Sequence, residues 1–236
     1  MTTFYQPNAA DGTHFLDEEE SRHAVKVLRL QSGNSITVVD GKGNYFQAHL
    51  QDNNPKRCSF SVISQHSQPL LPYSIHLAIA PTKNLDRMEW MVEKLTEVGV
   101  NSIQFVECDY SERRVLKLQR LYRKAISAMK QSGRALLPVL HEIRPLSSWK
   151  ALDNTQKFIA HIDDSHHQLL SKVVSPNKSY QVLVGPEGGF SSAEVIWATE
   201  RGFQVVGLGD FRLRTETAGL AACQTLHVIN TIHRSE

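Results

Sequence analysis

The sequence has few cysteines and no long hydrophobic run. Its three cysteines, Cys58, Cys108 and Cys223, lie far apart in 236 residues. This odd and scattered set argues against a disulfide framework and a cysteine-ligated zinc site, so we expect reduced thiols and a cytoplasmic protein. The apolar runs are only a few residues long, as at Val182–Val184, so we expect no bilayer-spanning segment. The first residues lack the basic start and apolar stretch of a secretory signal.

Several catalytic and cofactor motifs are also missing. The chain has no GxGxxG fingerprint and no Walker-type GxxxxGK[ST] sequence, so nicotinamide cofactors and nucleoside triphosphates are poorly supported. It has no GxSxG elbow for a nucleophilic serine. The segment 163–167 (Asp-Asp-Ser-His-His) has side chains that bind metals, but no distant cluster completes a site. We interpret this segment as a polar loop and expect no metal.

The chain has the composition of an ordinary globular protein, with 41% hydrophobic and 21% charged residues. Its first part is rich in β patterns. We expect strands at 36–40, 45–50 and 59–64, with one helix over 18–30. Residues 66–72 contain two prolines and predict a linker. We therefore expect one domain over 1–70 and a second over 73–236.

The second part alternates between strand and helix patterns. Met88, Met91, Val92, Leu95 and Val98 recur at helical spacing before Gly99, and Ser191 and Glu194 form a capping-box pattern. This alternation predicts an α/β domain with a largely parallel sheet. The expected strands are 74–80, 102–106, 157–162, 181–184 and 203–208, and the expected helices are 88–98, 111–130, 191–202 and 217–233.

Two loops at strand ends are candidates for chemistry. Residues 182–190 combine a buried strand, a Gly-rich loop and the start of a capped helix. Glycines allow a ligand to approach the backbone, and the unpaired N–H groups of a helix N-terminus suit an anion. Residues 208–218 repeat the strand–glycine–helix order, with Arg214 to Thr217 adding charge and donors. Alone, the first loop could be a tight turn and the second a solvated helix start. Together they favour a composite pocket.

A third feature is a run of positive charge. Residues 111–134 contain eight Lys or Arg and one acid, Glu112, in a chain whose net charge is only +2. Such a run is often only a solvated surface, but this excess favours binding of a phosphate backbone. A smaller basic group is expected on the helix of the first domain. The candidate RNA-binding residues are Arg22, Lys26, Arg29, Arg113, Arg114, Lys117 and Arg134.

These and other motifs resemble, in order, those of the ribosomal RNA small subunit methyltransferase E family. Its members are 16S rRNA (uracil-N3)-methyltransferases of the SPOUT class. The resemblance covers essentially the whole chain. It is carried by His23, Val27–Leu30, Asp40-Gly41, Lys83, Asp86–Met88, Glu93-Lys94, Thr96-Glu97, Gly99-Val100, Ser111–Arg113, Gln131–Arg134, Pro138, Gly185–Ser191 and Leu213–Ala218.

The resemblance implies the fold and the cofactor. It implies a C-terminal domain with a trefoil knot, an N-terminal PUA-like β-barrel that binds RNA, and a homodimer with its pocket near the subunit interface. The cofactor would be S-adenosylmethionine, bound in three loops near 161–163, 183–189 and 208–218. The expected cofactor-binding residues are His161, Leu183, Gly185, Pro186, Glu187, Gly188, Gly189, Leu208, Gly209, Leu213, Arg214, Thr215 and Ala218.

The chain departs from the family pattern in two places. Phe211 stands where the pattern has an arginine, and Arg212 follows it where the pattern has isoleucine. A charged contact has therefore moved by one residue or been lost. Lys130 stands where the family often has glutamate. Since the glycines and Arg214 are intact, we expect cofactor binding to be retained.

The chemistry implied by the resemblance suggests roles for three residues. Uracil N3 is a poor nucleophile until it loses its proton, and the negative charge then spreads onto the flanking carbonyl oxygens. A fixed cation would stabilise this charge. Arg214 is our first candidate and Arg134 the second, although Arg214 could instead form an ion pair with Glu216 or Glu187. Glu187 is a candidate general base, or a residue that ties down its loop.

Two other functions remain open. The chain could be a SPOUT methyltransferase acting on transfer RNA or on a ribose 2′-hydroxyl. It could also be a non-catalytic RNA-binding factor in ribosome assembly, for which Phe211 is the only support. The N-terminal barrel and the length of the resemblance favour 16S ribosomal RNA in the small subunit as the partner, with no membrane and no metal involved.

Overall fold

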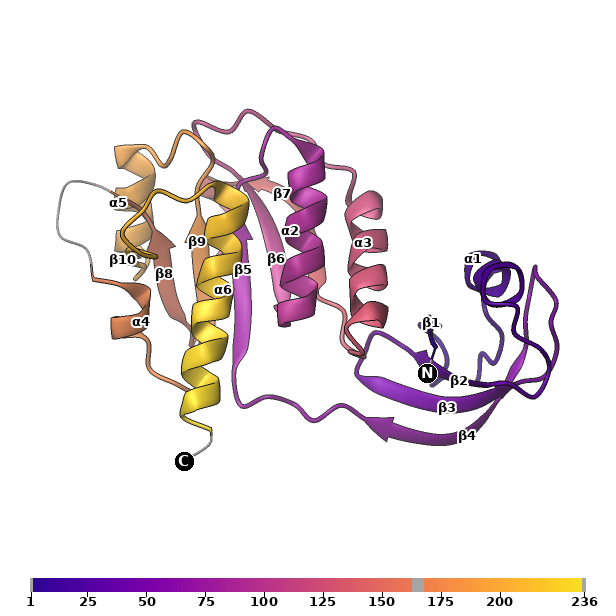
Figure 1. Ribbon diagram of the computed structural model, residues 1–236. Coiled ribbons are helices and arrows are strands. Elements are labelled where there is room, and N and C mark those ends of the chain that lie inside the picture. The colour runs from indigo at the N-terminus through magenta and orange to yellow at the C-terminus, as the bar shows by residue number, and fades with distance from the viewer. Residues whose placement is uncertain (1, 163–167, 235–236) are drawn as a thin grey trace. The chain divides into compact units, whose positions relative to one another are not determined.

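A computed structural model gives the fold, and the structure describes residues 2–162 and 168–234. The chain divides into two compact units. The first unit contains residues 1–70 and 125–137, and the second contains residues 71–124 and 138–236. Each unit has its own sheet (Figure 1). In the described residues, no helix is both long enough and apolar enough to cross a membrane.

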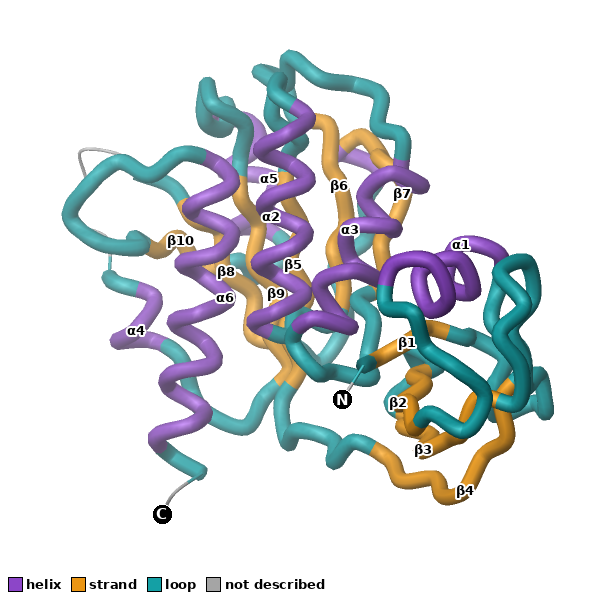
Figure 2. The backbone as a smooth tube through the Cα atoms, turned by 45° about the vertical axis from the view of Figure 1, so that its right-hand side comes forward, coloured by secondary structure: helices purple, strands orange, loops and turns teal. Residues whose placement is uncertain are grey.

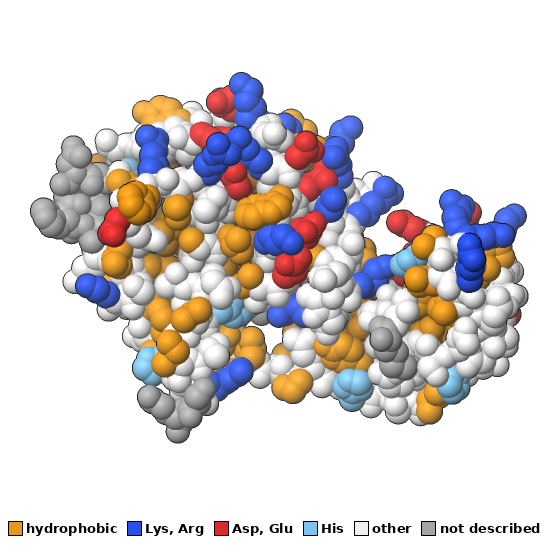
Figure 3. Space-filling view, in the orientation of Figure 1, with side chains coloured by type: hydrophobic (Ala, Val, Ile, Leu, Met, Phe, Trp, Pro, Cys, Tyr) orange, Lys and Arg blue, Asp and Glu red, His pale blue; other side chains and the backbone are white. Residues whose placement is uncertain are grey.

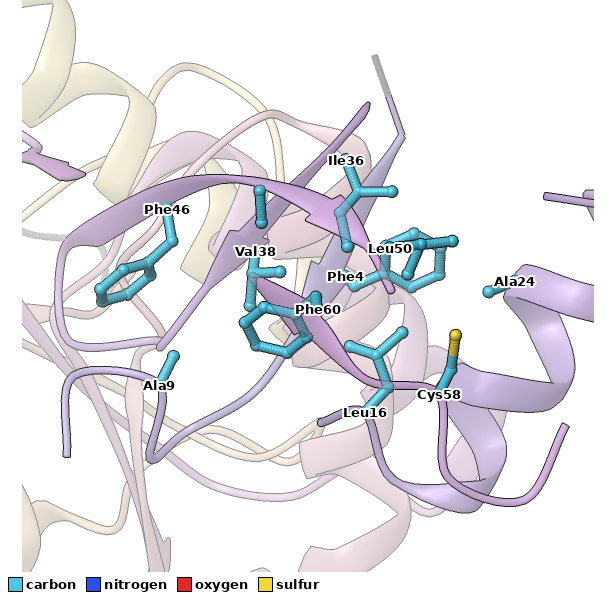
Figure 4. Packing of buried hydrophobic residues seen from close by; sticks show 11 residues of the cluster. Phe4, Ala9, Leu16, Ala24, Ile36, Val38, Phe46, Leu50, Cys58 and Phe60 are labelled. Atoms are coloured by element: carbon cyan, nitrogen blue, oxygen red, sulfur yellow. The ribbon is translucent and has the colours of Figure 1, made fainter. Parts of the chain in front are cut away.

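The first unit is built on a mixed four-stranded sheet in the order β1-β2-β3-β4. Its strands are β1 (Thr3–Tyr5), β2 (Ser35–Val39), β3 (Asn44–Leu50) and β4 (Phe60–Ser67). β1 runs parallel to β2, and the other neighbours are antiparallel. Side chains that alternate along the strands, such as Phe4, Val38 and Phe46, form its core with Leu16 and Phe60 (Figure 4). Burial alternates with period 2 along β3, as expected for a strand with one face on the core.

The helix expected over 18–30 is shorter and changes type. α1 (Glu18–Arg22) begins at Asp17, whose carboxylate accepts the Glu20 N–H, and a π-helical turn follows over His23–Val27. The helical prediction is wrong beyond this turn, because Arg29 adopts a left-handed conformation with φ 56°. Arg22, Lys26 and Arg29 are all exposed. They do not lie on one continuous α-helix, so the helical spacing expected to place them on one side does not apply.

Residues 125–137 complete the first unit. Gly43 N–H donates to the Ala135 carbonyl and Leu137 N–H donates to the Gly41 carbonyl, at 2.8 and 2.9 Å. Met129 and Ala135 pack with Val39 in a small apolar cluster. Lys130 pairs with Glu20, a carboxylate that is almost fully buried. Lys130, one of the two departures from the family pattern, is therefore half of an ion pair inside this unit.

We expect Lys130→Met to destabilise the protein by about 3 kcal/mol near pH 8, because it leaves a buried charge without its partner. Burial raises the pKa of the Glu20 carboxyl, and Lys130 opposes this effect. A carboxyl with a raised pKa contributes stability below its unfolded pKa and loses it as the pH rises through its folded pKa. Without Lys130 the pKa of Glu20 rises further, so the loss should shrink towards pH 4.5.

Denaturant unfolding at the two pH values checks this prediction. The double variant Glu20→Gln/Lys130→Met is the matched control, since it removes both charges and should regain part of the lost stability. If Lys130→Met costs the same free energy at both pH values, the ion pair with Glu20 is not the cause.

The second unit contains a six-stranded sheet in the order β10-β8-β9-β5-β6-β7, with every neighbouring pair parallel. The sequence predicted this parallel α/β sheet correctly, although it did not predict β7. The strands are β5 (Ser74–Ile79), β6 (Ser102–Glu107), β7 (Val139–Pro145), β8 (Gln156–Ala160), β9 (Ser179–Val184) and β10 (Gln204–Val206).

Helices cover both faces of this sheet. On one face α2 and α6 lie side by side, as Figures 1 and 2 show, and Gly219 of α6 allows close contact with Leu77 and Ile79. On the other face Ala78 and Leu183 lie in a cluster that includes Ala198 of α5. The central strands are apolar on both sides for this reason. The helices are α2 (Leu85–Val98), α3 (Leu118–Gln131), α4 (Leu170–Val173), α5 (Ser192–Glu200) and α6 (Thr215–Ile232), and a 3-10 turn spans Leu146–Ser148.

The sequence predicted the end of α2 and the start of α5 correctly, but it placed the start of α3 too early. Gly99 ends α2 with φ 100°, and Ser191 and Glu194 make both bonds of the capping box of α5. The helix expected from residue 111 is wrong in its first turns, since α3 begins at Leu118. The Ser111 hydroxyl accepts the Cys108 N–H, and Arg113 bonds the carbonyl oxygens of Thr82 and Lys83. These bonds hold the segment outside the helix.

Candidate functional site

A pocket of about 530 Å³ lies in the second unit, where three parallel strands end. The chain leaves β8, β9 and β10 at this edge, which is the usual ligand position in a parallel sheet. Its volume is in the range of small-molecule sites. The lining residues are Ala160, His161, Ile162, Val184, Gly185, Pro186, Glu187, Gly188, Gly189, Phe190, Val206, Leu208, Phe211, Arg212, Leu213, Arg214, Thr215 and Ala218.

The loop after β9 needs its glycines. Gly189 has φ 78°, and its N–H donates to the Pro186 carbonyl at 2.9 Å, which closes a tight turn. A Cβ on Gly185 would lie 3.0 Å from the Phe190 ring, and a Cβ on Gly188 would lie 2.9 Å from Cβ of Tyr110. The segment is therefore a tight strand-to-helix turn, and it also lines the pocket, so the expectation that it binds a ligand stays a prediction.

The loop after β10 is bonded to the Gly-rich loop. The Thr215 hydroxyl donates to the Gly185 carbonyl at 3.0 Å, and both groups are buried. α6 begins here, and no side chain caps its N-terminus at Arg214. Thr215 and Ala218, in the first turn of α6, line the pocket. The N-terminal N–H groups and the positive end of the helix dipole make this edge suitable for a carboxylate.

Arg214 is an exposed cation at the pocket. Among the described residues its side chain forms no ion pair and no hydrogen bond. The two acids considered as its partners are engaged elsewhere. Glu216 is buried and lies 3.7 Å from Arg87, and Glu187 accepts the Lys83 N–H at 3.2 Å. The guanidinium of Arg214 is thus available to a ligand.

Arg212 keeps a second positive charge at the pocket. Its Nη2 donates to the Glu187 carbonyl at 3.5 Å. The neighbouring Phe211 lines the pocket as well, with its side chain largely in solvent. The arginine missing at position 211 is thus offset by one at the next residue.

Most of the predicted cofactor-binding residues line this pocket, and two do not. Leu183 is fully buried in the core beneath the loop, and Gly209 (φ 143°) turns the loop without facing the pocket. The sequence did not indicate the apolar wall at the strand ends, because buried strand residues carry no ligand signal. Seven further lining residues were not named as cofactor-binding. Ile162, Val184, Phe211 and Arg212 lie within the three expected loops, whereas Ala160, Phe190 and Val206 lie outside them.

The other predicted residues are not among those that line the pocket. Arg134 follows α3 in the first unit. Arg114 pairs with Glu107 at 3.2 Å, and Arg113 bonds backbone carbonyl oxygens, while Lys117 is exposed. Acids from another helix offset part of the basic run, since Glu89 of α2 pairs with both Arg120 and Lys124.

No group of three metal-binding side chains occurs within residues 2–162 and 168–234. The segment 163–167, interpreted above as a polar loop, lies outside the described residues.

Two protein families match different parts of the chain. Residues 69–227 match the RNA methyltransferase domain family, and residues 16–63 match the RNA methyltransferase PUA domain family. The ribosomal RNA small subunit methyltransferase E of Aquifex aeolicus is 30% identical, over 92% of this chain and 95% of the relative.

Two solved structures are also similar. One, described as a probable rRNA-methyltransferase from Porphyromonas gingivalis, is 40% identical with a TM-score of 0.93, over 99% of this chain and all of that one. The other is a ribosomal RNA small subunit methyltransferase E from Neisseria gonorrhoeae bound to S-adenosyl methionine. It is 31% identical with a TM-score of 0.84, over 97% of this chain and 98% of that one.

Proposed function

The chain belongs to the ribosomal RNA small subunit methyltransferase E family, and on this basis we propose that it methylates N3 of a uridine in 16S ribosomal RNA of the small subunit, using S-adenosylmethionine. The observation that carries the proposal is the pocket at the ends of β8, β9 and β10, with an unpartnered arginine at its edge. We also propose that residues 1–70 are the RNA-binding domain, that 73–236 are the methyltransferase domain, and that the pocket loops form the expected trefoil knot.

The pocket residues fit the chemistry of S-adenosylmethionine. Val184, Val206 and Leu208 provide an apolar wall for the adenine ring, and the N-terminal N–H groups of α6 suit the carboxylate of the amino-acid part. When bound, the cofactor supplies an electrophilic methyl group. The protein must hold uracil N3 in line with that group, and such positioning provides much of the acceleration.

Arg214 is proposed to stabilise the charge on the uracil. As N3 loses its proton, negative charge develops on the flanking carbonyl oxygens, and a guanidinium already in place stabilises it. The exposed position of Arg214 at the pocket and its lack of a partner support this role. Arg134 remains the second candidate. The bond from Lys83 N–H to Glu187 supports a loop-holding role for Glu187, with general base as its alternative.

The RNA is proposed to contact exposed basic residues of both units. Lys26, Arg29 and Lys117 are exposed and suited to phosphate contacts. Figure 3 shows Lys and Arg side chains, interspersed with Asp and Glu, along the upper edge of the second unit. We further propose that the protein is a cytoplasmic homodimer. The exposed Val228 and Ile232 lie one turn apart on α6, and covering them would remove apolar surface from water.

Two measurements separate this proposal from its alternatives. Calorimetry with S-adenosylmethionine should show binding, whereas a non-catalytic RNA-binding factor should give little heat. Transfer of labelled methyl groups should then be compared on small ribosomal subunits and on transfer RNA. Label in transfer RNA alone, or on a ribose, would contradict the proposed substrate while keeping the methyltransferase activity.

A further inference from the structure

Two phenylalanines line the pocket, and their surroundings differ sharply. The Phe190 side chain is only 7% exposed, and its ring packs on Gly185 and lies 6.4 Å from the His161 ring. The Phe211 side chain is 80% exposed in the loop between β10 and α6. Phe190 is therefore part of the pocket wall, whereas the Phe211 ring meets solvent at the pocket edge.

The charges around Phe211 suit a nucleic acid. Arg212 and Arg214 follow it within three residues, and both line the same pocket. Arg212 bonds the Glu187 carbonyl, while Arg214 has no partner among the described residues. An aromatic face beside guanidinium groups is the combination that proteins use for an unstacked base and its phosphates.

We infer that Phe211 is the residue on which the target base stacks when it leaves the RNA helix. This inference rests on the proposed function and adds a specificity-determining contact to it. A base taken out of its stack loses contact with its neighbours, and an aromatic ring at the destination offsets part of that loss. Because Phe211 lines the pocket, a base on its ring lies beside the space proposed for the cofactor.

The same position explains the departure from the family pattern. The pattern has an arginine at 211, and the plane of a guanidinium also stacks on bases. Phe211 thus keeps a planar group at this position, while Arg212 keeps the positive charge one residue later. The two changes compensate for each other in this chain.

The test compares four variants of the full-length protein. Phe211→Ala removes the ring, Phe211→Leu keeps an apolar side chain without a ring, and Phe211→Trp keeps a ring. Ile196→Ala is the control, because Ile196 is exposed on α5 and is not a pocket residue. The measurements are kcat and KM on small ribosomal subunits lacking the modification, together with the Kd for S-adenosylmethionine.

We expect Phe211→Ala and Phe211→Leu to lower kcat/KM by about tenfold to a hundredfold, mainly through KM for the subunit. The Kd for the cofactor should stay within about threefold of wild type. Phe211→Trp and Ile196→Ala should stay close to wild type. Wild-type kinetics for Phe211→Leu would overturn the inference, because a ring would not be needed. An equal loss of cofactor affinity, or dissociation of an oligomer in light scattering, would also overturn it.

A binding measurement keeps the inference separate from the proposed function. The tryptophan of Phe211→Trp should lose fluorescence when a single-stranded 16S rRNA fragment containing uridine is added, and wild type should show no matching change. If quenching occurs but wild type transfers no methyl group to any RNA, the stacking role stands and the proposed function fails. If methyl transfer occurs without quenching, the stacking role fails.

Discussion

Replacing Arg214 with alanine is expected to lower kcat for methyl transfer by about a hundredfold to a thousandfold, the usual cost of removing one group that stabilises transition-state charge. The Kd for S-adenosylmethionine should change by less than about threefold. Arg214 is exposed and has no partner among the described residues, so its removal leaves no buried group unpaired. The variant should therefore fold as wild type does, and its kinetic defect should belong to the chemical step.

Two further variants sharpen this prediction. Arg214→Lys keeps the charge but loses the planar fork, so it should recover only part of the activity. Arg212→Ala removes the neighbouring guanidinium, which bonds the Glu187 carbonyl, and should affect kcat less than Arg214→Ala does. Single-turnover kinetics and calorimetry measure the two effects separately. Equal losses in methyl transfer and cofactor binding would assign Arg214 to the cofactor pocket instead.

Replacing Gly185 with alanine is expected to weaken S-adenosylmethionine binding by about tenfold to a hundredfold, in line with the cost of overpacking. The new Cβ would lie 3.0 to 3.2 Å from three atoms of the Phe190 ring. Phe190 is almost fully buried, so its ring has little room to move. The loop must therefore shift, and with it the Gly185 carbonyl that accepts the Thr215 hydroxyl.

Gly207 offers a matched control near the end of β10. A Cβ there would lie 3.5 Å from Leu169, which is an ordinary contact, and Gly207 does not line the pocket. Gly207→Ala should keep the wild-type Kd within about twofold. Calorimetry on both variants, with thermal unfolding as a check on folding, measures the difference. Similar cofactor affinities for the two variants would show that the Gly-rich loop does not bind the cofactor.

The sequence predicted the pocket because strand direction is a strong constraint. The carboxyl ends of parallel strands meet at one edge of the sheet, which favoured a shared pocket for the loops 182–190 and 208–218. The third loop, near 161–163, was expected only from the family resemblance. Local chemistry also identified two helices of the same unit. Gly99 ended one helix, and the pair Ser191 and Glu194 began another. These signals act within a few residues, which is why a single sequence contains them.

Contacts between distant segments were not predictable in this way. The first turns of the expected helix over 111–130 are not helical, because Arg113 bonds the carbonyl oxygens of Thr82 and Lys83. Residues 125–137 join the first unit through bonds to Gly41 and Gly43, and nothing in their own pattern indicates that partner. β7 was missed because it is an exposed edge strand without a clear alternation.

The role of Arg214 shows a similar limit. The sequence left a choice between a catalytic cation and an ion pair with a nearby acid. The structure places Glu216 next to Arg87, a residue more than a hundred positions away in sequence, and Glu187 on the Lys83 backbone. The fold pairs both acids with residues far away in sequence, and the Arg214 side chain is therefore left without a partner among the described residues.

The central claim is methylation of N3 of a uridine in 16S ribosomal RNA, and nucleoside analysis tests it most directly. Small ribosomal subunits lacking the modification are incubated with the protein and labelled S-adenosylmethionine, and the RNA is digested to nucleosides. The account predicts label in N3-methyluridine at one position of 16S ribosomal RNA. Label in another nucleoside, or no label from a protein that binds the cofactor, would contradict it.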